Sequence, residues 1–123
     1  MNTLKPNFNK INFEPIDINF YNIHDVNKFK TMKSKLLTFN SILLNDNSKI
    51  KNYLKSKYID KNITLQTGLM LSAYIGNYEM VKLLINKEIG YVDLYDRSAL
   101  FYAENALIKN DDIIKLLEEY ETC

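Results

Sequence analysis

The second half of the chain contains two similar passages, and their spacing limits the possible fold more than any other feature. The first opens with Thr-Gly-Leu-Met at 67–70 and closes with Val-Lys-Leu-Leu at 81–84. The second opens with Ser-Ala-Leu-Phe at 98–101 and closes with Ile-Lys-Leu-Leu at 114–117. The openings lie 31 residues apart and the closings 33. A period near 33 indicates stacked units of two helices, which predicts a binding scaffold rather than a catalytic pocket.

Composition is that of an ordinary soluble domain. The chain has 123 residues, of which 46% are hydrophobic and 25% charged, enough for one compact domain with a core. No apolar run is long enough to span a membrane, and no secretory signal pattern is present at the start. The only cysteine is Cys123, which excludes an intramolecular disulfide and suits a reducing compartment. We therefore expect a cytoplasmic protein.

Charge is distributed unevenly along the chain. Residues 1–62 hold eleven lysines against five acids, a balance of +6, and residues 63–123 hold five basic residues against ten acids, a balance of −5. Such asymmetry leaves open a basic N-terminal helical hairpin that binds nucleic acid or an anionic membrane, with the repeats as a tether. Complementary charge within one stack, or a solvated helix face, explains the same pattern. Nucleic-acid-binding domains are usually more basic and richer in arginine.

The N-terminal part divides into an extended or mobile segment, 1–24, and a helical hairpin, 25–57. The segment holds both prolines and alternates apolar and polar residues at 16–20, as an extended strand does. After a capping Asp25, apolar residues recur every three or four positions through about Leu44, which predicts a helix. The polar run 45–48 then breaks it.

A second helix is predicted to begin at Asn47 or Ser48. Its apolar residues Ile50, Tyr53 and Leu54 would face inward, and its lysines at 49, 51, 55 and 57 would face solvent. We interpret the hairpin as a degenerate repeat or an N-terminal cap.

Capping residues mark the helices of the first repeat, 64–90. Thr67 can cap a short helix, because its hydroxyl can accept a hydrogen bond from a free N–H of the first turn. Gly76 suits the left-handed geometry at the end of that helix, and Asn77 can cap the next one, predicted from about Tyr78 to Asn86.

The terminal repeat, 93–121, shows the same order of signals. Ser98 can cap a helix that extends over Leu107, and Asn110 can cap the last helix. The last helix ends in the polar run Glu-Glu-Tyr-Glu at 118–121. A polar outer side is what a terminal unit of a stack requires.

From about Asp60 to Glu119 the chain resembles the ankyrin-repeat family. Residues 67–73 stand where the family has Thr-Pro-Leu-His-x-Ala-Ala, 76–77 at its Gly-His turn, and 81–84 at its Val-x-x-Leu-Leu. The resemblance implies an all-α, short ankyrin-like stack in which each unit buries its apolar face against a neighbour.

The repeats depart from the family pattern in several places. Gly68 and Ala99 replace the proline, and Met70 and Phe101 replace the histidine, so the hydrogen bonds of that histidine give way to apolar packing. The second unit lacks the glycine turn, and its connector is shorter than the usual finger.

Residues that could carry catalysis or bind a metal are scarce. His24 is the only histidine, there is no His/Cys ligand set, and the three glycines are dispersed. We therefore expect no enzyme activity, no metal and no cofactor, and a partner that is another protein rather than nucleic acid, a membrane or a small-molecule substrate.

The resemblance implies a non-catalytic protein-interaction module or adaptor. Its binding positions would lie on the inner helices and the connector tips, with Arg97 as a directional hydrogen-bond donor. Tyrosine is a favoured interface anchor, but several of these tyrosines fit core filling equally well. The positions implied as partner-binding are Tyr74, Ile75, Leu94, Tyr95, Arg97 and Asn105.

Overall fold

The computed structural model describes residues 37–62 and 64–121. The predicted segment 1–24 and the predicted helix start at Asp25 lie outside these residues. The described part contains six helices and no strand, apart from an isolated bridge between Lys61 and Thr67. The helices are α2 (Leu37–Leu43), α3 (Asn47–Leu54), α4 (Gly68–Tyr74), α5 (Tyr78–Glu88), α6 (Ala99–Glu104) and α7 (Asp111–Glu121).

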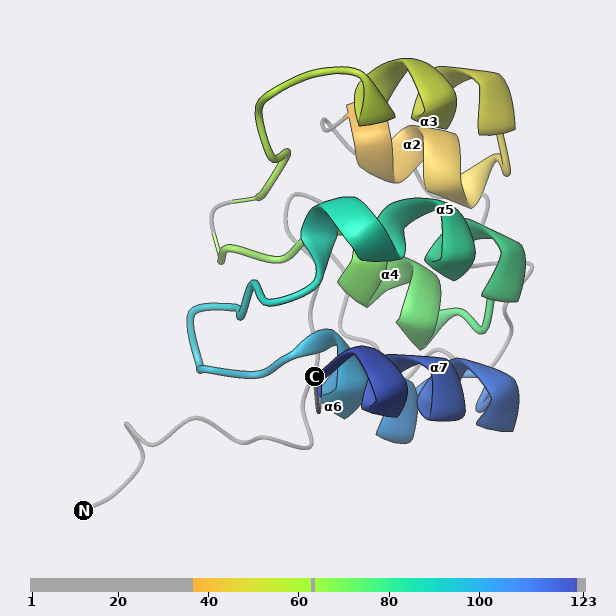
Figure 1. Ribbon diagram of the computed structural model, residues 1–123, viewed down its shortest axis with the longest axis vertical. Coiled ribbons are helices and arrows are strands. Elements are labelled where there is room, and N and C mark those ends of the chain that lie inside the picture. The colour runs from red at the N-terminus through yellow and green to blue at the C-terminus, as the bar shows by residue number, and fades with distance from the viewer. Residues whose placement is uncertain (1–36, 63, 122–123) are drawn as a thin grey trace.

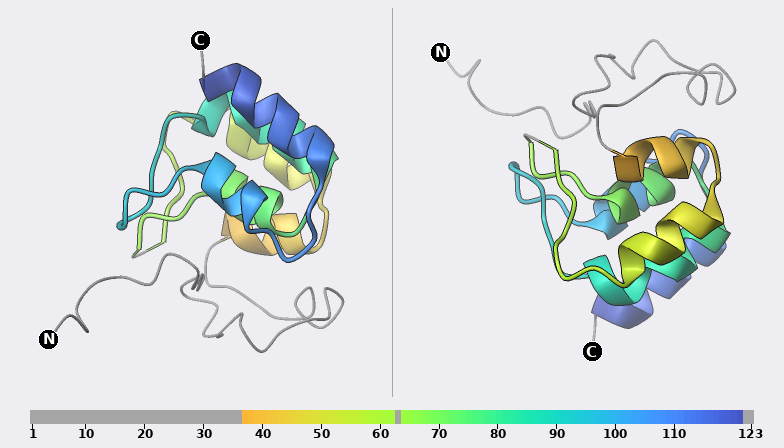
Figure 2. Two further views of the ribbon diagram at one scale, coloured as in Figure 1. Left: turned by 90° about the horizontal axis from the view of Figure 1, so that it is seen from below. Right: turned by 90° about the horizontal axis from the view of Figure 1, so that it is seen from above.

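The helices form three stacked pairs, α2–α3, α4–α5 and α6–α7 (Figure 1). Packing between pairs produces two layers, because α2 contacts α4 and α4 contacts α6, while α3 contacts α5 and α5 contacts α7. The connectors 55–67 and 89–98 both project to the same side of the stack (Figure 2). This is the all-α repeat stack that the sequence predicts.

The capping hydroxyls predicted at the start of each repeat are confirmed. Thr67 Oγ1 accepts a hydrogen bond from the Met70 N–H at 3.4 Å, and Ser98 Oγ accepts one from the Phe101 N–H at 3.4 Å. Each cap satisfies one of the helix N–H groups that has no partner within the helix. The matching caps fix α4 and α6 at equivalent positions in their units.

The second helix of each repeat is also capped by the predicted residue. Asn77 Oδ1 accepts from the Met80 N–H at 3.1 Å, and Asn110 Oδ1 accepts from the Ile113 N–H at 3.3 Å. The helix α5 continues to Glu88, two residues beyond its predicted end. This extension places Glu88 inside the stack, where its side chain is buried.

The first described pair follows its predicted pattern. The helix α3 begins at Asn47 and is capped by Asp46, whose side chain accepts from the Lys49 N–H. Ile50 and Tyr53 are buried and Leu54 is partly buried. The predicted solvent-facing side chains are all exposed: Lys49, Lys51, Lys55 and Lys57.

The prediction that the helix after Ser98 extends over Leu107 is wrong. The helix α6 ends at Glu104, and the Asn105 side chain donates to the Phe101 carbonyl at 2.9 Å, next to that end. The chain then leaves the helix because the Leu107 N–H donates to the Tyr74 carbonyl in the neighbouring unit, at 2.9 Å. A contact with the adjacent repeat therefore replaces another turn of helix.

One continuous core runs through the three pairs. Its largest fully buried side chains come from all three units. They are Tyr102, Phe39, Ile42, Ile50, Leu69, Met70, Leu71, Met80 and Leu84. Met70, which replaces the family's histidine, is fully buried, as the predicted apolar packing requires. The predicted loss of hydrogen bonding at this position is wrong, because the Met70 sulfur accepts a hydrogen bond from the Thr67 N–H at 3.4 Å.

Gly76 is required for the turn between α4 and α5. Its φ of +73° lies in the left-handed region, and an added Cβ would stand 2.7 Å from the Ile108 carbonyl oxygen. We expect Gly76→Ala to lower the free energy of unfolding by more than about 2 kcal/mol, because left-handed geometry costs roughly 1–2 kcal/mol and the steric clash adds to it. Urea unfolding measures the loss.

Gly90→Ala is the matched control for this substitution. Gly90 also has a positive φ, +96°, but an added Cβ there meets nothing within 4 Å. The Gly90→Ala variant should therefore lose only the conformational contribution to the free energy of unfolding, about 1–2 kcal/mol. Equal losses at the two glycines would contradict the proposed clash with Ile108.

Candidate protein-binding surface

Exposed apolar side chains are concentrated in the two connectors. Nine large hydrophobic side chains are exposed in the described part of the chain, and six of them lie in 55–67 or 89–98. The six are Tyr58, Leu65, Tyr91, Val92, Leu94 and Tyr95. We call the group Leu65, Tyr91, Leu94 and Tyr95, with Lys61, the connector-tip surface.

The first connector presents Leu65 on a tight turn. The Asn62 N–H donates to the Gln66 carbonyl at 3.2 Å, and the Leu65 N–H donates to the Asn62 carbonyl at 3.0 Å. Leu65 itself has a φ of +64°, which is uncommon for a branched residue and strained. The Asn62 side chain supports this geometry, because Oδ1 accepts from the backbone N–H groups of Thr64 and Gln66 at 3.1 and 2.8 Å.

The second connector is organised by Asp93. Its Oδ1 accepts from the backbone N–H groups of Tyr95 and Arg97, both at 2.9 Å. The Asp93 N–H donates to the Arg97 carbonyl at 3.0 Å, which closes the turn. Leu94 and Tyr95 lie between these anchors, with 59% and 40% of their areas exposed. The turn therefore directs two apolar side chains outward.

Direct contacts join the two connectors at their tips. The Leu94 N–H donates to the Thr64 carbonyl at 2.9 Å. The Lys61 ammonium lies 5.3 Å from the centre of the Tyr91 ring, within the range of a cation–π interaction. Segments about 30 residues apart in sequence therefore form one surface.

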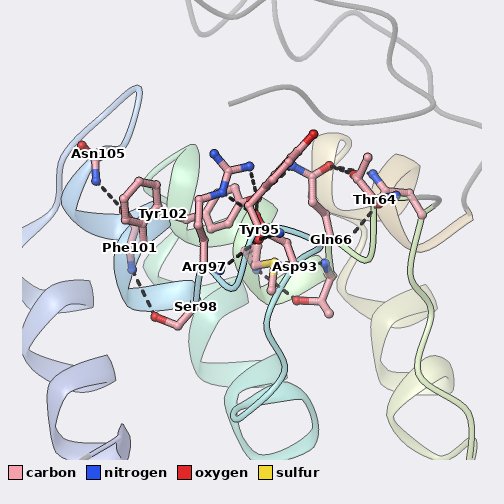
Figure 3. Close-up of polar contacts among 12 residues, drawn as sticks. Thr64, Gln66, Asp93, Tyr95, Arg97, Ser98, Phe101, Tyr102 and Asn105 are labelled. Carbon is pink, nitrogen blue, oxygen red and sulfur yellow. Dashed lines mark hydrogen bonds and ion pairs between the residues drawn. The ribbon is translucent and has the colours of Figure 1, made fainter. Parts of the chain in front are cut away.

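A buried polar network holds this surface from beneath (Figure 3). Asp93 Oδ2 accepts from Arg97 Nε at 2.7 Å and from the Tyr102 hydroxyl at 2.5 Å. Gln66 Nε2 donates to the Tyr102 hydroxyl at 2.9 Å, and Gln66 Oε1 accepts from Asn62 Nδ2 at 2.7 Å. The network therefore links both connectors to α6.

Electrostatics keep Tyr102 in its neutral form. Burial raises the pKa of the Tyr102 hydroxyl well above its usual value, and its hydrogen bond to Asp93 raises it further. The hydroxyl therefore remains a donor to Asp93 throughout the normal pH range. Arg97 is buried beside this pair, and its guanidinium also lies 5.1 Å from the Tyr95 ring centre.

The residues implied as partner-binding divide into two groups. Leu94, Tyr95 and Asn105 are exposed, whereas Tyr74, Ile75 and Arg97 are buried. Tyr74 belongs to α4 and Ile75 is its C-cap, so both support the inner layer.

The role expected for Arg97 needs a correction. Its side chain is only 5% exposed and its Nε is paired with Asp93. Arg97 therefore positions the connector rather than serving as a donor on an open face.

Other exposed residues of the connectors were not among the implied binding positions. Leu65, Val92 and Tyr58 are exposed as well. A large apolar residue inside a polar connector, such as Leu65 between Thr64 and Gln66, is the signal that could have identified one of them. Its left-handed backbone is visible only in the structure.

The described residues lack a cluster of metal ligands and a membrane-spanning helix. Within 37–62 and 64–121, no three His, Cys, Asp or Glu side chains come together as metal ligands. In the same ranges, no helix has the length and apolar character needed to cross a bilayer.

Stacked helix pairs with connectors along one edge define a helical-repeat scaffold. The family model for ankyrin repeats (three copies) matches residues 39–122. The chain therefore belongs to the ankyrin-repeat family. Members generally act as protein–protein interaction modules and are typically non-catalytic. No significant match was found among curated proteins or among solved structures.

Proposed function

We propose that this protein is a non-catalytic adaptor that binds another protein through the connector-tip surface. The observation that carries the proposal is the outward projection of Leu94 and Tyr95 from a turn fixed by Asp93. Exposed apolar side chains grouped in this way commonly mark interaction sites. We place the protein in the cytoplasm, because a chain with a single cysteine is compatible with a reducing compartment.

Rigidity favours binding at this position. Association normally costs conformational entropy when loops and side chains become ordered. Here the tips are already held by the Leu94–Thr64 hydrogen bond and by the network beneath them. Tyrosine adds a large contact area with few rotatable bonds. Binding of a partner should therefore cost this surface little conformational entropy.

The energetics fit a partner with a complementary apolar patch. Full burial of a leucine is worth roughly 1.5–3 kcal/mol, and Leu94 is more than half exposed in the free protein. The tips also carry Lys61 and Asp96, both exposed, which can contact polar groups at the rim of an interface. Leu94 and Tyr95 would be the central contacts.

The first test combines Leu94→Ala with Tyr95→Ala. We expect partner affinity to fall by at least about tenfold, because alanine removes most of the apolar area of both side chains and tyrosine is among the residues enriched at binding hot spots. The free energy of unfolding should fall by no more than about 1 kcal/mol, since Leu94 is mostly exposed and Tyr95 loses mainly its ring contact with Arg97. Calorimetric or optical binding measurements with the captured partner, together with thermal melts, separate these effects.

Leu44→Ala is the matched control, because Leu44 is 71% exposed and lies next to the turn between α2 and α3. A photo-crosslinking residue at position 94 should capture the partner in cells, and one at position 44 should not. Undiminished binding by the double variant would count against this surface. Binding to RNA or anionic vesicles that falls steeply with salt would instead support the basic-hairpin alternative.

A further inference from the structure

Glu88 is a buried acid that the connector-tip surface does not use. It is the last residue of α5, and only 1% of its area is exposed. Its two carboxylate oxygens accept hydrogen bonds from different elements. Oε2 accepts from the Tyr53 hydroxyl at 2.5 Å, and Oε1 accepts from the Leu69 N–H at 2.6 Å.

The carboxyl group joins two helix pairs. Tyr53 belongs to α3 in the first described pair, whereas Leu69 and Glu88 belong to α4 and α5 in the second. The Tyr53 hydroxyl also accepts a hydrogen bond from the Asp60 N–H at 2.9 Å. A single carboxyl group therefore connects α3, both helices of the next pair, and the connector between the pairs.

Both hydrogen-bond donors to this carboxyl group are uncharged. The neighbouring cation, Lys87, directs its ammonium to the carbonyl oxygens of Tyr53 and Ser56 at 3.0 and 2.7 Å. The neighbouring acid, Asp60, accepts from the Thr38 hydroxyl at 2.5 Å. An ionised Glu88 would thus be a buried charge held mainly by neutral dipoles, which is costly.

A proton can be added without losing the hydrogen-bond geometry. Oε1 can remain the acceptor for the Leu69 N–H while Oε2 carries the proton. The Tyr53 hydroxyl can either donate to Oε2 or accept from it, because a phenol does both. The neutral carboxyl group is therefore compatible with the same three-helix contact.

We propose that Glu88 is a proton-controlled latch between the first two described helix pairs. Protonation of its carboxyl group strengthens the packing of α3 on α5, and ionisation weakens it, because the packed pairs remove Glu88 from water. The hydrogen bond from the Tyr53 hydroxyl offsets only part of the cost of burying the ionised group. The proposal goes beyond partner binding, and it can be tested without any partner.

The electrostatic environment places this titration near neutral pH. Burial raises the pKa of the Glu88 carboxyl group to about 7. The Tyr53 and Leu69 hydrogen bonds and the charge of Lys87 oppose the rise, and Asp60 adds to it. Because the pKa is higher in the folded than in the unfolded chain, folding takes up a proton between these two values. The stabilisation is complete below the unfolded pKa and is lost as pH rises to about 7.

The central experiment compares the wild type with Glu88→Gln by urea unfolding from pH 4.5 to pH 8. Glutamine is neutral and close in size, so the variant lacks the titration. The unfolding equilibrium constant of the wild type should rise with pH, relative to that of Glu88→Gln, by on the order of a hundredfold. Glu79→Gln is the control, since Glu79 lies in the same helix with an exposed side chain. Parallel pH profiles for wild type and Glu88→Gln would overturn the proposal.

Carboxyl carbon NMR of the wild type provides a test that does not depend on a folded Glu88 variant. The Glu88 signal should titrate with a midpoint near 7. Tyr53→Phe removes the hydroxyl that stabilises the ionised form, so it should move this midpoint upward. A midpoint near the ordinary glutamate value, or one that Tyr53→Phe leaves unmoved, would refute the latch.

Hydrogen exchange tests whether the effect is local to the two pairs. After correction for intrinsic exchange, protection of α3 amides should fall between pH 5 and pH 8 more than protection of α6 amides. Equal changes in the two helices would show that Glu88 sets global stability only, and would contradict a latch.

Discussion

Asp93→Ala should lower the free energy of unfolding by about 3–5 kcal/mol, because it leaves a buried cation without its partner. The Arg97 side chain is 5% exposed, and its Nε lies 2.7 Å from Asp93 Oδ2. The substitution also removes the acceptor for the Tyr102 hydroxyl and for two backbone N–H groups of the connector. Chemical unfolding at constant pH measures the loss.

The double variant Asp93→Ala with Arg97→Ala shows whether the pair is responsible. Without the cation, the remaining site holds no unpaired charge, so the double variant should lose less than the sum of the single losses. Additive losses, or a loss below about 1 kcal/mol for Asp93→Ala alone, would show that the ion pair does not fix the connector.

The same network explains why stability and binding should be linked at the connector but not at its tips. Asp93 holds the backbone of Tyr95 and Arg97, whereas the Leu94 and Tyr95 side chains project outward. Substitutions beneath the tips should therefore weaken both folding and partner binding. Substitutions of the tip side chains should weaken mainly binding, with only a small loss of stability from the Tyr95–Arg97 contact.

Local signals made much of the repeat fold predictable. A capping hydroxyl acts within three residues of its own position, as at Thr67 and Ser98. The Gly76–Asn77 turn is equally local, because one residue supplies a left-handed φ and the next caps a helix. These choices depend little on the rest of the chain.

The features that escaped prediction depend on distant partners. In the sequence, Glu88 resembles an ordinary exposed acid near the end of a helix. The structure shows that it is hydrogen-bonded to Tyr53, which lies 35 residues earlier. The end of α6 at Glu104 likewise follows from a hydrogen bond between Leu107 and Tyr74. Sequence period identifies which units stack, but not which side chains meet between them.

Arg97 shows how this limit affects the candidate site. An arginine in a connector normally suggests an exposed donor, because charged residues are rarely buried without a partner. Its partner, Asp93, was visible four residues earlier in the sequence. Only the closed turn shows that the two side chains face each other beneath Tyr95.

Leu84→Ala should lower the free energy of unfolding by about 2–5 kcal/mol, the usual range for truncating a buried leucine. Leu84 is fully buried in α5, the middle helix of its layer. An added Cβ at Gly68 would stand 3.3 Å from a Leu84 methyl group and 2.8 Å from one of Ile42, so the helices approach closely here. Because helix pairs pack on both sides of α5, the neighbouring side chains can move little to fill the cavity that the truncation leaves.

Leu83→Ala is the matched control, because Leu83 is the adjacent residue of the same helix but is only partly buried. Its loss should be clearly smaller, since fewer contacts vanish and water can fill the space. Thermal melts of the two variants make the comparison directly. The repeat register requires Leu84, like its counterpart Leu117, to face the interior. A larger loss of stability at Leu83 than at Leu84 would therefore show that the other face of α5 packs against the stack, and it would contradict the repeat register.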